Sequence, residues 1–194
     1  MKVMKRFYFL VCLIAMLSGY TESFAQRWTV WYGVNCANEM QRGPLDHWHF
    51  ANGGVDCTFP VSRWDLTVGA GLNTTGGELR INYAQLETNA GYRFVDMPGG
   101  FRLSALAGPY CGIRVADNHK DWTPFLPEPN RFAFGWQAGI QMGFKPFVLK
   151  VGYEQALTAY YDKSFTDTDV YADGTLVFPT AKPHSLFIRI GYMF

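Results

Sequence analysis

His184-Ser-Leu-Phe-Ile-Arg-Ile-Gly-Tyr-Met-Phe194 is the stretch from which the fold of this chain can be predicted. Successive side chains of a strand point to opposite faces, so its residues fall into two sets. One face carries the apolar set Leu186, Ile188, Ile190, Tyr192 and Phe194. The other face carries Ser185, Phe187, Arg189, Gly191 and Met193. The first face is suited to lipid and the second tolerates charge, so the pattern predicts a strand between an oily environment and a polar one.

The same alternation recurs in seven earlier segments, which are residues 28–37, 49–59, 64–73, 79–94, 101–115, 132–144 and 147–158. Segment 79–94 changes phase, because Leu79, Ile81 and Tyr83 are odd-numbered whereas Leu86 and the apolar residues after it are even-numbered. A β-bulge between Tyr83 and Gln85 would restore one apolar face. Alternation over ten residues is typical of strands and is poor material for a helix.

The composition favours a membrane barrel over a soluble domain. Aromatic residues make up 17% of the chain and charged residues only 17%, with 20 glycines, yet beyond the N-terminal segment no run of apolar residues is long enough for a helical span. In a barrel, lipid-facing aromatics alternate with lumen-facing glycine and polar groups, which accounts for this mixture. A formal net charge of +1 gives no electrostatic footprint for nucleic acid. We therefore expect no nucleic-acid partner.

The links between the segments alternate between short and long. Residues 60–63, 95–100 and 145–146 are short and rich in Pro or Gly, whereas three of the other links, 38–48, 117–131 and 160–183, are clearly longer. The fourth, 73–78, is not. Barrels of the outer membrane have short periplasmic turns and longer external loops, so we expect both termini on the periplasmic side. The sequence predicts an all-β, eight-stranded, antiparallel, up-and-down transmembrane barrel whose last strand pairs with its first. An edge strand of a soluble sandwich is the alternative.

Residues 1–25 have the features of a cleavable secretory signal. Lys2, Lys5 and Arg6 precede the apolar run 7–17, and Ser23-Phe-Ala25 places small residues at a cleavage position. The run is too short to span a bilayer. We therefore expect a signal peptide over 1–25 and a barrel domain over 26–194.

Four short motifs carry a family resemblance: Asn82–Phe94, Ala107–Gly112, Phe134–Gln141 and Lys150–Glu154. They resemble the PorT-like outer-membrane β-barrel family of Gram-negative bacteria over essentially the whole mature chain. The resemblance implies an integral outer-membrane protein surrounded by outer-membrane lipid and lipopolysaccharide. Segment 184–194 also resembles the closing strand of such barrels, which implies that Tyr192 and Phe194 form part of the signal read by the barrel-assembly machinery.

The predicted inner face carries both signs of charge. Its members are Asp56, Asp65, Glu87 and Glu154 with Arg93, Arg102, Arg114, Lys150 and Arg189. An eight-stranded barrel is just wide enough for side chains to fill it, and unpaired buried charges are costly. We therefore expect a lumen closed by salt bridges. A polar channel for a small solute is the alternative.

No catalytic or metal constellation is apparent. His184 and Ser185 are adjacent in an extended segment and point to opposite faces, so they cannot form a nucleophile and base pair. His47 and His49 fall on one loop and His119 on another, which is a weak case for a metal site. We expect neither an enzyme nor a cofactor, with a lipid A-modifying enzyme as the rival class.

Three cysteines remain in the mature chain, namely Cys36, Cys57 and Cys111. Cys36 and Cys57 lie on neighbouring predicted strands with the same facing, so a disulfide can be considered. Thiols are equally acceptable as small apolar groups. The strict separation that a disulfide needs favours thiols.

Two of the long links combine aromatic and polar residues. The aromatic candidates for recognition are Trp122, Phe125, Tyr160, Tyr161, Phe165 and Tyr171. Exposed aromatic residues beside polar ones suit a surface that binds an envelope protein, and they equally suit the lipopolysaccharide interface. The sequence as a whole predicts a structural or interaction protein whose external loops carry its specificity.

Overall fold

The computed structural model describes residues 26–38, 45–76, 80–118, 128–159, 170–172, 175–177 and 182–194. The expected signal peptide and His119 lie outside the described residues. So do five of the six aromatic loop candidates, Trp122, Phe125, Tyr160, Tyr161 and Phe165. At Tyr171 and His47, which lie in strands, only the backbone is described. The structure therefore bears on the barrel and leaves the signal and loop predictions as predictions.

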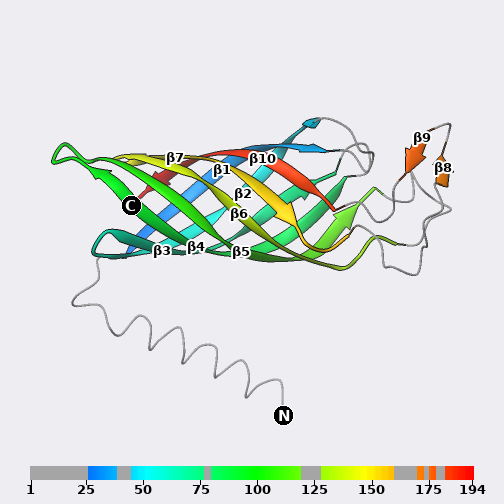
Figure 1. Cartoon of the computed structure of the whole chain (residues 1–194), viewed down its shortest axis with the longest axis horizontal. Coiled ribbons are helices and arrows are strands. Elements are labelled where there is room, and N and C mark those ends of the chain that lie inside the picture. The colour runs from blue at the N-terminus through cyan, green and yellow to red at the C-terminus, as the bar shows by residue number, and fades with distance from the viewer. Residues whose placement is uncertain are drawn as a thin grey trace, which may run out of the picture.

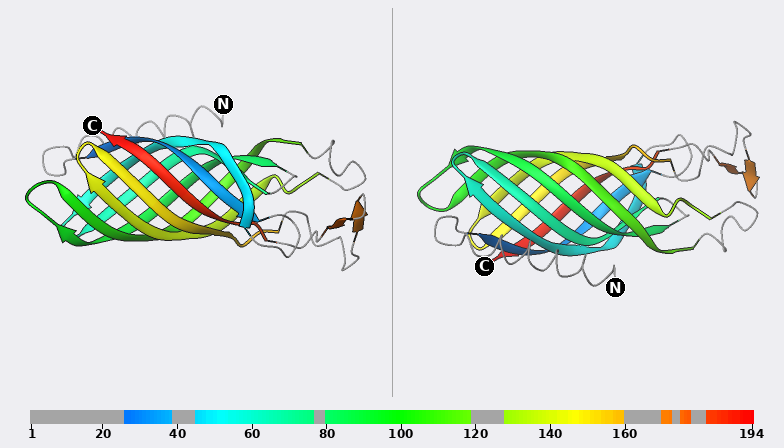
Figure 2. Two further views of the ribbon diagram at one scale, coloured as in Figure 1. Left: turned by 90° about the horizontal axis from the view of Figure 1, so that it is seen from above. Right: turned by 90° about the horizontal axis from the view of Figure 1, so that it is seen from below.

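Eight long antiparallel strands close into one barrel, which confirms the predicted fold (Figures 1 and 2). They are β1 (Arg27–Asn38), β2 (Leu45–Val61), β3 (Trp64–Thr75), β4 (Ile81–Asp96), β5 (Phe101–Asp117), β6 (Phe132–Phe144), β7 (Phe147–Ala156) and β10 (His184–Met193). A separate ladder joins β8 (Val170–Ala172) to β9 (Thr175–Val177). Among the described residues there is no helix that could span a bilayer.

The barrel closes where the first strand meets the last. β1 and β10 pair from Thr29 with Met193 to Ala37 with Ser185. The ladder continues to Trp28 and Phe194, whose backbone groups exchange hydrogen bonds of 3.3 and 3.0 Å. This pairing removes the two free edges that an open sheet would present.

Side chains alternate between an exposed apolar exterior and a buried interior that is largely polar. In β10, Ile190 is 61% exposed and Tyr192 53%, whereas Phe187 is 1% and Arg189 2% exposed. Inward side chains of the other strands include buried Asp56, Glu87 and further polar groups. This arrangement inverts that of a soluble protein, where apolar groups lie inside.

The predicted bulge in β4 is wrong. The odd-numbered residues of β4 face inward from its start, so that Ile81 is 0% exposed and Tyr83 5%. At this place the extra residue lies in β5 instead, because Asn82 pairs with Ala116 while Tyr83 pairs with Arg114. The extra residue of β4 is Phe94, farther along the strand, since Arg93 pairs with Ser104 and Val95 with Leu103. The first two inward positions of β4 take apolar side chains, and the Tyr83 ring covers Gly112, where an added Cβ would stand 3.1 Å from Tyr83 Cβ.

The strand ends that the short turns join lie at one end of the barrel, and the strand ends that the other links join lie at the opposite end, as predicted (Figure 1). Residues 62–63, 97–100 and 145–146 make the short turns near the end of β10. The first long link is shorter than predicted: β2 begins at Leu45, so the link between β1 and β2 is residues 39–44 rather than 38–48. Strand β2 therefore begins well before Gly53, where its pairing with β3 starts.

Candidate functional site

The centre of the lumen is organised around Arg189. Its guanidinium carbon lies 4.5 Å from the Trp31 ring centroid and 4.4 Å from that of Phe187. A cation held over aromatic faces and removed from water is stabilised by the ring quadrupoles. Phe187 was expected on the same face as Arg189, but neither ring was predicted to belong to the site.

Both rings occupy space that glycine leaves open on neighbouring strands. Phe187 pairs with Gly152, where an added Cβ would stand 2.5 Å from the ring's Cζ. Trp31 pairs with Gly54, where an added Cβ would stand 2.7 Å from Cζ2. An aromatic residue facing glycines across the strands was therefore the sequence signal that would have found them.

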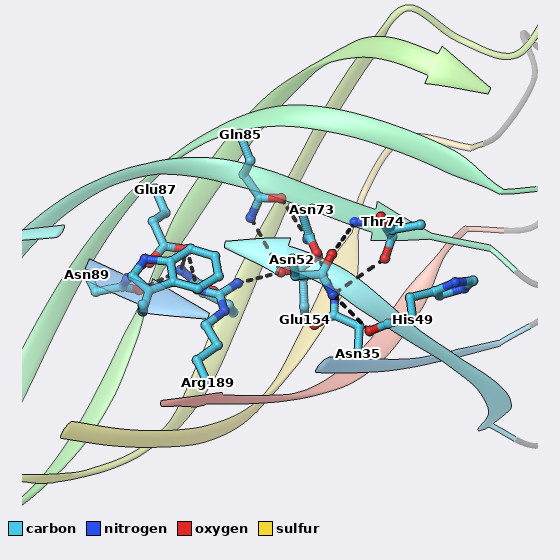
Figure 3. Close-up of polar contacts among 12 residues, drawn as sticks. Asn35, His49, Asn52, Asn73, Thr74, Gln85, Glu87, Asn89, Glu154 and Arg189 are labelled. Carbon is cyan, nitrogen blue, oxygen red and sulfur yellow. Dashed lines mark hydrogen bonds and ion pairs between the residues drawn. The ribbon is translucent and has the colours of Figure 1, made fainter. Parts of the chain in front are cut away.

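Two carboxylates complete the surroundings of Arg189 (Figure 3). Its Nη1 lies 2.7 Å from Glu87 Oε2, and its Nη2 lies 3.5 Å from Glu154 Oε2. Gln137 Nε2 donates a further hydrogen bond of 2.9 Å to Glu87 Oε2. This buried cation is thus held between two rings and two anions, which come from its own strand β10 and from β1, β4 and β7.

A second buried pair lies beside the first. The Lys150 ammonium forms an ion pair with Asp56, and Trp31 Nε1 donates a 3.0 Å hydrogen bond to the other oxygen of Asp56. Trp31 therefore connects the two pairs, because its ring also contacts Arg189. The central group contains three carboxylates and two cations, so the charges are nearly balanced within it.

The other predicted lumen charges form separate groups at the two ends. At the turn end, Arg93 lies 3.2 Å from Asp65 and 2.8 Å from Asp96, and Arg102 lies 3.2 Å from Asp96. Asp96 was not among the predicted residues, because it lies at the very end of β4.

At the opposite end, Arg114 lies 3.4 Å from Asp117 and 2.6 Å from Glu128. The prediction also missed these two acidic partners, which lie at and beyond the end of β5. The nine predicted charges thus form three groups rather than one network.

Neutral amides extend the central group toward the long-link end. Asn73 Nδ2 donates a hydrogen bond of 2.6 Å to Glu154 Oε1 and one of 2.8 Å to Gln85 Oε1. Asn35 Nδ2 in turn donates to Asn73 Oδ1. A continuous polar chain therefore runs from Arg189 to the rim of the barrel (Figure 3).

This chain ends where the ladder between β2 and β3 is open. The two strands pair only as far as Gly53 with Leu72. Beyond that point β2 continues paired with β1 alone, and β3 continues paired with β4 alone. We call this opening the β2–β3 gap. It leaves backbone groups of residues 48–52 and 73–75 without a partner strand on one side.

Side chains supply the missing hydrogen bonds across the β2–β3 gap. Asn52 Oδ1 accepts from the Thr74 backbone N–H at 2.7 Å, and Asn52 Nδ2 donates to the His49 carbonyl at 3.2 Å. His49 Nε2 in turn contacts the Gly76 carbonyl oxygen. Buried backbone groups need partners, so these side chains take the place of the ladder.

The lumen offers little free space. One cavity between Asp56, Asp65 and Lys150 has a volume of about 20 Å³, and another beside Gln85 and Glu154 about 10 Å³. Each is about the size that holds one water molecule. The arrangement is suited to filling the barrel rather than to holding a substrate.

The structure does not bring the nucleophile and metal candidates together. Ser185 is buried inside, whereas His184 lies beside Tyr153 with ring centroids 6.0 Å apart. His49 belongs to the gap, and no cluster of metal-binding side chains occurs in the described ranges. In the register of β1 and β2, Cys36 lies opposite Trp48 and Cys57 lies opposite Trp28, so the two cysteines are far apart. No disulfide joins them, as predicted.

No protein-family profile and no curated protein sequence matches the chain. Among solved structures, it is similar to the N-terminal β-barrel domain of Pseudomonas aeruginosa OprF, with 13% identity, coverage of 89% of this chain and 100% of that chain, and a TM-score of 0.45. It is also similar to Ail of Yersinia pestis, in complex with the heparin analogue sucrose octasulfate, with 16% identity, coverage of 87% of this chain and 97% of that chain, and a TM-score of 0.41. A third similar structure is Neisserial surface protein A, with 11% identity, coverage of 87% of this chain and 97% of that chain, and a TM-score of 0.45.

Proposed function

We propose that this chain is an integral protein of the outer membrane of a Gram-negative bacterium, with a closed lumen and a structural or interaction role carried by its external loops. The observation that supports this most directly is the inverted burial of β10, where Ile190 is 61% exposed and Arg189 is 2% exposed. A closed sheet with an oily exterior satisfies its backbone internally, as a bilayer demands.

The exterior supports the membrane proposal on every strand of the barrel. The exposed large apolar side chains include Tyr32, Phe50, Val68, Leu86, Ile113, Phe134, Val151 and Ile190. Monomeric soluble proteins rarely expose an apolar patch of more than a few hundred Å². Lipid is the environment in which such a surface is stable.

The closed lumen is supported by the packing around Arg189. Trp31 and Phe187 fill the cross-section, and Glu87 and Glu154 neutralise the cation. Moving a solute through this layer would require breaking buried ion pairs, which is costly. The central group therefore acts as a plug in this proposal.

The orientation and the assembly route follow from the same proposal. The short turns and both ends of the barrel domain face the periplasm, and the long links face outward toward lipopolysaccharide. Tyr192, which packs against Phe147 with centroids 5.9 Å apart, and Phe194 lie where the assembly machinery would read a closing strand. The PorT-like resemblance is consistent with this assignment and remains part of the proposal.

Conductance measurement tests the closed lumen. We expect purified barrel domain, refolded in detergent and inserted into a planar bilayer, to show no steady conductance steps. The combined variant Trp31→Ala and Phe187→Ala should introduce them, because it removes both rings from the cross-section. Steady conductance of the unaltered protein would show a pore and overturn the plug.

The external loops are tested separately. We expect replacement of residues 119–127 or 160–169 by short Gly-Ser links to abolish recovery of an envelope partner in a mild-detergent pull-down while leaving the folded barrel intact. Recovery of the same partner with both links replaced would show that the barrel wall, not the loops, makes the contact.

A further inference from the structure

A hollow of about 530 Å³ lies at the long-link end, beside the β2–β3 gap. Its lining residues are Trp48, His49, Phe50, Thr74, Arg80 and Asn82. The polar chain of the lumen reaches its inner side through His49. Nothing in the closed lumen uses this hollow, so its chemistry is considered on its own.

The hollow opens on the outer face of the barrel. Trp48 is 54% and Phe50 62% exposed. Thr74 and Asn82 are paired in the register on the phase of the exposed Leu72 and Leu86, with Thr74 buried and Asn82 half-buried at the floor of the hollow. Aromatic residues at the outer rim of a barrel lie at the level of lipid headgroups.

Two hydrogen-bond donors face this hollow. Arg80 is exposed, and in the described part of the chain no carboxylate lies within ion-pair distance of it. Its backbone is fixed by Asn118, whose Oδ1 accepts from the Arg80 N–H at 2.7 Å. Asn82 Oδ1 accepts from the Thr74 hydroxyl at 2.7 Å, which orients the Asn82 amide N–H groups as the remaining donors.

The surface below the donors is apolar and shallow. Leu72 is 52% exposed and pairs with Gly53 on one side and Ala84 on the other. Small neighbours on both flanks leave a path along the barrel wall in which an extended hydrocarbon chain can lie. Phe50, which is exposed, lines the hollow on the β2 side.

We propose that this hollow binds the phosphate group of a lipid of the outer leaflet, with the lipid's acyl chain along Leu72. A guanidinium and an amide match phosphate oxygens, which form strong charge-assisted hydrogen bonds. The flanking apolar path selects an anion that carries a chain over a free anion. This inference depends on the proposed function, because it requires the rim to lie in the outer leaflet.

The test compares two lipids that differ only in phosphate. Purified barrel in detergent is mixed with lipid A or with the same lipid A after removal of its phosphates, and native mass spectrometry measures the fraction that carries one lipid. We expect a preference of about tenfold for the phosphorylated form, since one hydrogen bond to a charged group raises a binding constant by about tenfold or more. Arg80→Gln should remove the preference.

A matched control is available at the same rim. Arg131 is also exposed, and its guanidinium carbon lies 6.0 Å from the Phe132 ring centroid, outside the hollow. Arg131→Gln should keep the full preference. An excess of inorganic phosphate should not displace the lipid.

Three outcomes would overturn the inference: equal retention of the two lipids by the unaltered protein, an unchanged preference in Arg80→Gln, or complete displacement by inorganic phosphate. Failure of the proposed function would look different. In that case the unaltered chain would not form a heat-modifiable barrel in detergent, and it would be soluble without detergent.

Discussion

Phe187 lies across Gly152 of the neighbouring strand, so that a Cβ on Gly152 would stand 2.5 Å from the ring's Cζ. The glycine is therefore part of the packing of the ring, and the ring is part of the site of Arg189. The same Cβ would stand 2.5 Å from the Ala138 carbonyl oxygen, so a methyl group at position 152 would both push Phe187 toward the guanidinium and move the strand away from β6. The central charges of the lumen thus depend on the absence of one side chain.

Gly152→Ala should lower the free energy of unfolding by about 1–3 kcal/mol, the usual cost of adding a methyl group to a packed interior. Urea unfolding in phospholipid vesicles, followed by Trp fluorescence, measures the change. Gly143→Ala is the control, since a Cβ at that inward position would meet only Arg102 Cβ at 3.7 Å. Equal effects of the two substitutions would contradict the packing argument.

Glu87→Gln should lower the free energy of unfolding by about 3–5 kcal/mol, because it leaves the buried Arg189 with a single carboxylate, that of Glu154 at 3.5 Å. The same urea titration measures it. Asp96→Asn is the comparison, since Asp96 has a 44% exposed side chain and its removal should cost less than about 1 kcal/mol. Adding Arg189→Met to Glu87→Gln should recover part of the loss. A double variant less stable than Glu87→Gln would show that the cation is stabilised by the two rings and Glu154 without Glu87.

The facing of the strands could be predicted from the sequence because a period of two leaves only one choice once a single residue is placed. Arg189 between Ile188 and Ile190 fixes the phase of the whole of β10. In β4 the argument failed, because Ile81 and Tyr83 are apolar residues that face inward. Polarity indicates facing only where the inward residues of a strand are polar, and at the start of β4 they are not.

The partners of the charges could not be predicted from facing alone. Arg189 and Glu87 are 102 residues apart, and their contact depends on the stagger of several strands at once. The β2–β3 gap was missed for a related reason, because β2 was expected to begin at His49 rather than Leu45. Without the extra residues of β2 there is no unpaired segment and no hollow beside it.

Cys111 provides a direct test of what surrounds the barrel wall. It is exposed and faces outward between Leu86 and Phe134 in the register. If lipid covers this row, a lipid-soluble maleimide should label the vesicle-inserted protein at Cys111, whereas a charged, membrane-impermeant maleimide should not. Mass spectrometry of peptides reports the site, and Cys111→Ser should remove the label. Rapid labelling by the charged reagent in intact vesicles would place this row in water.

At the β2–β3 gap, the Thr74 amide depends on a side chain for its hydrogen bond. Its N–H donates to Asn52 Oδ1 at 2.7 Å in place of a β2 carbonyl. Asn52→Ala removes that acceptor, so the amide loses a hydrogen bond worth about 1–3 kcal/mol in a buried site. Hydrogen exchange at Thr74, followed by NMR in micelles, should accelerate about tenfold to a hundredfold.

Asn52→Asp separates the bond from the bulk of the side chain. It keeps an oxygen for the Thr74 N–H, loses the 3.2 Å donation from Asn52 Nδ2 to the His49 carbonyl, and buries a carboxyl group in its place, which lowers the stability of the whole barrel rather than that of the Thr74 hydrogen bond alone. Exchange at Thr74 should therefore stay slow in this variant, while amides of β3 that pair with β2 below Leu72 serve as internal references in both. If Asn52→Ala leaves Thr74 protected, then some other group caps the strand, and the gap is not held together by the Asn52 side chain.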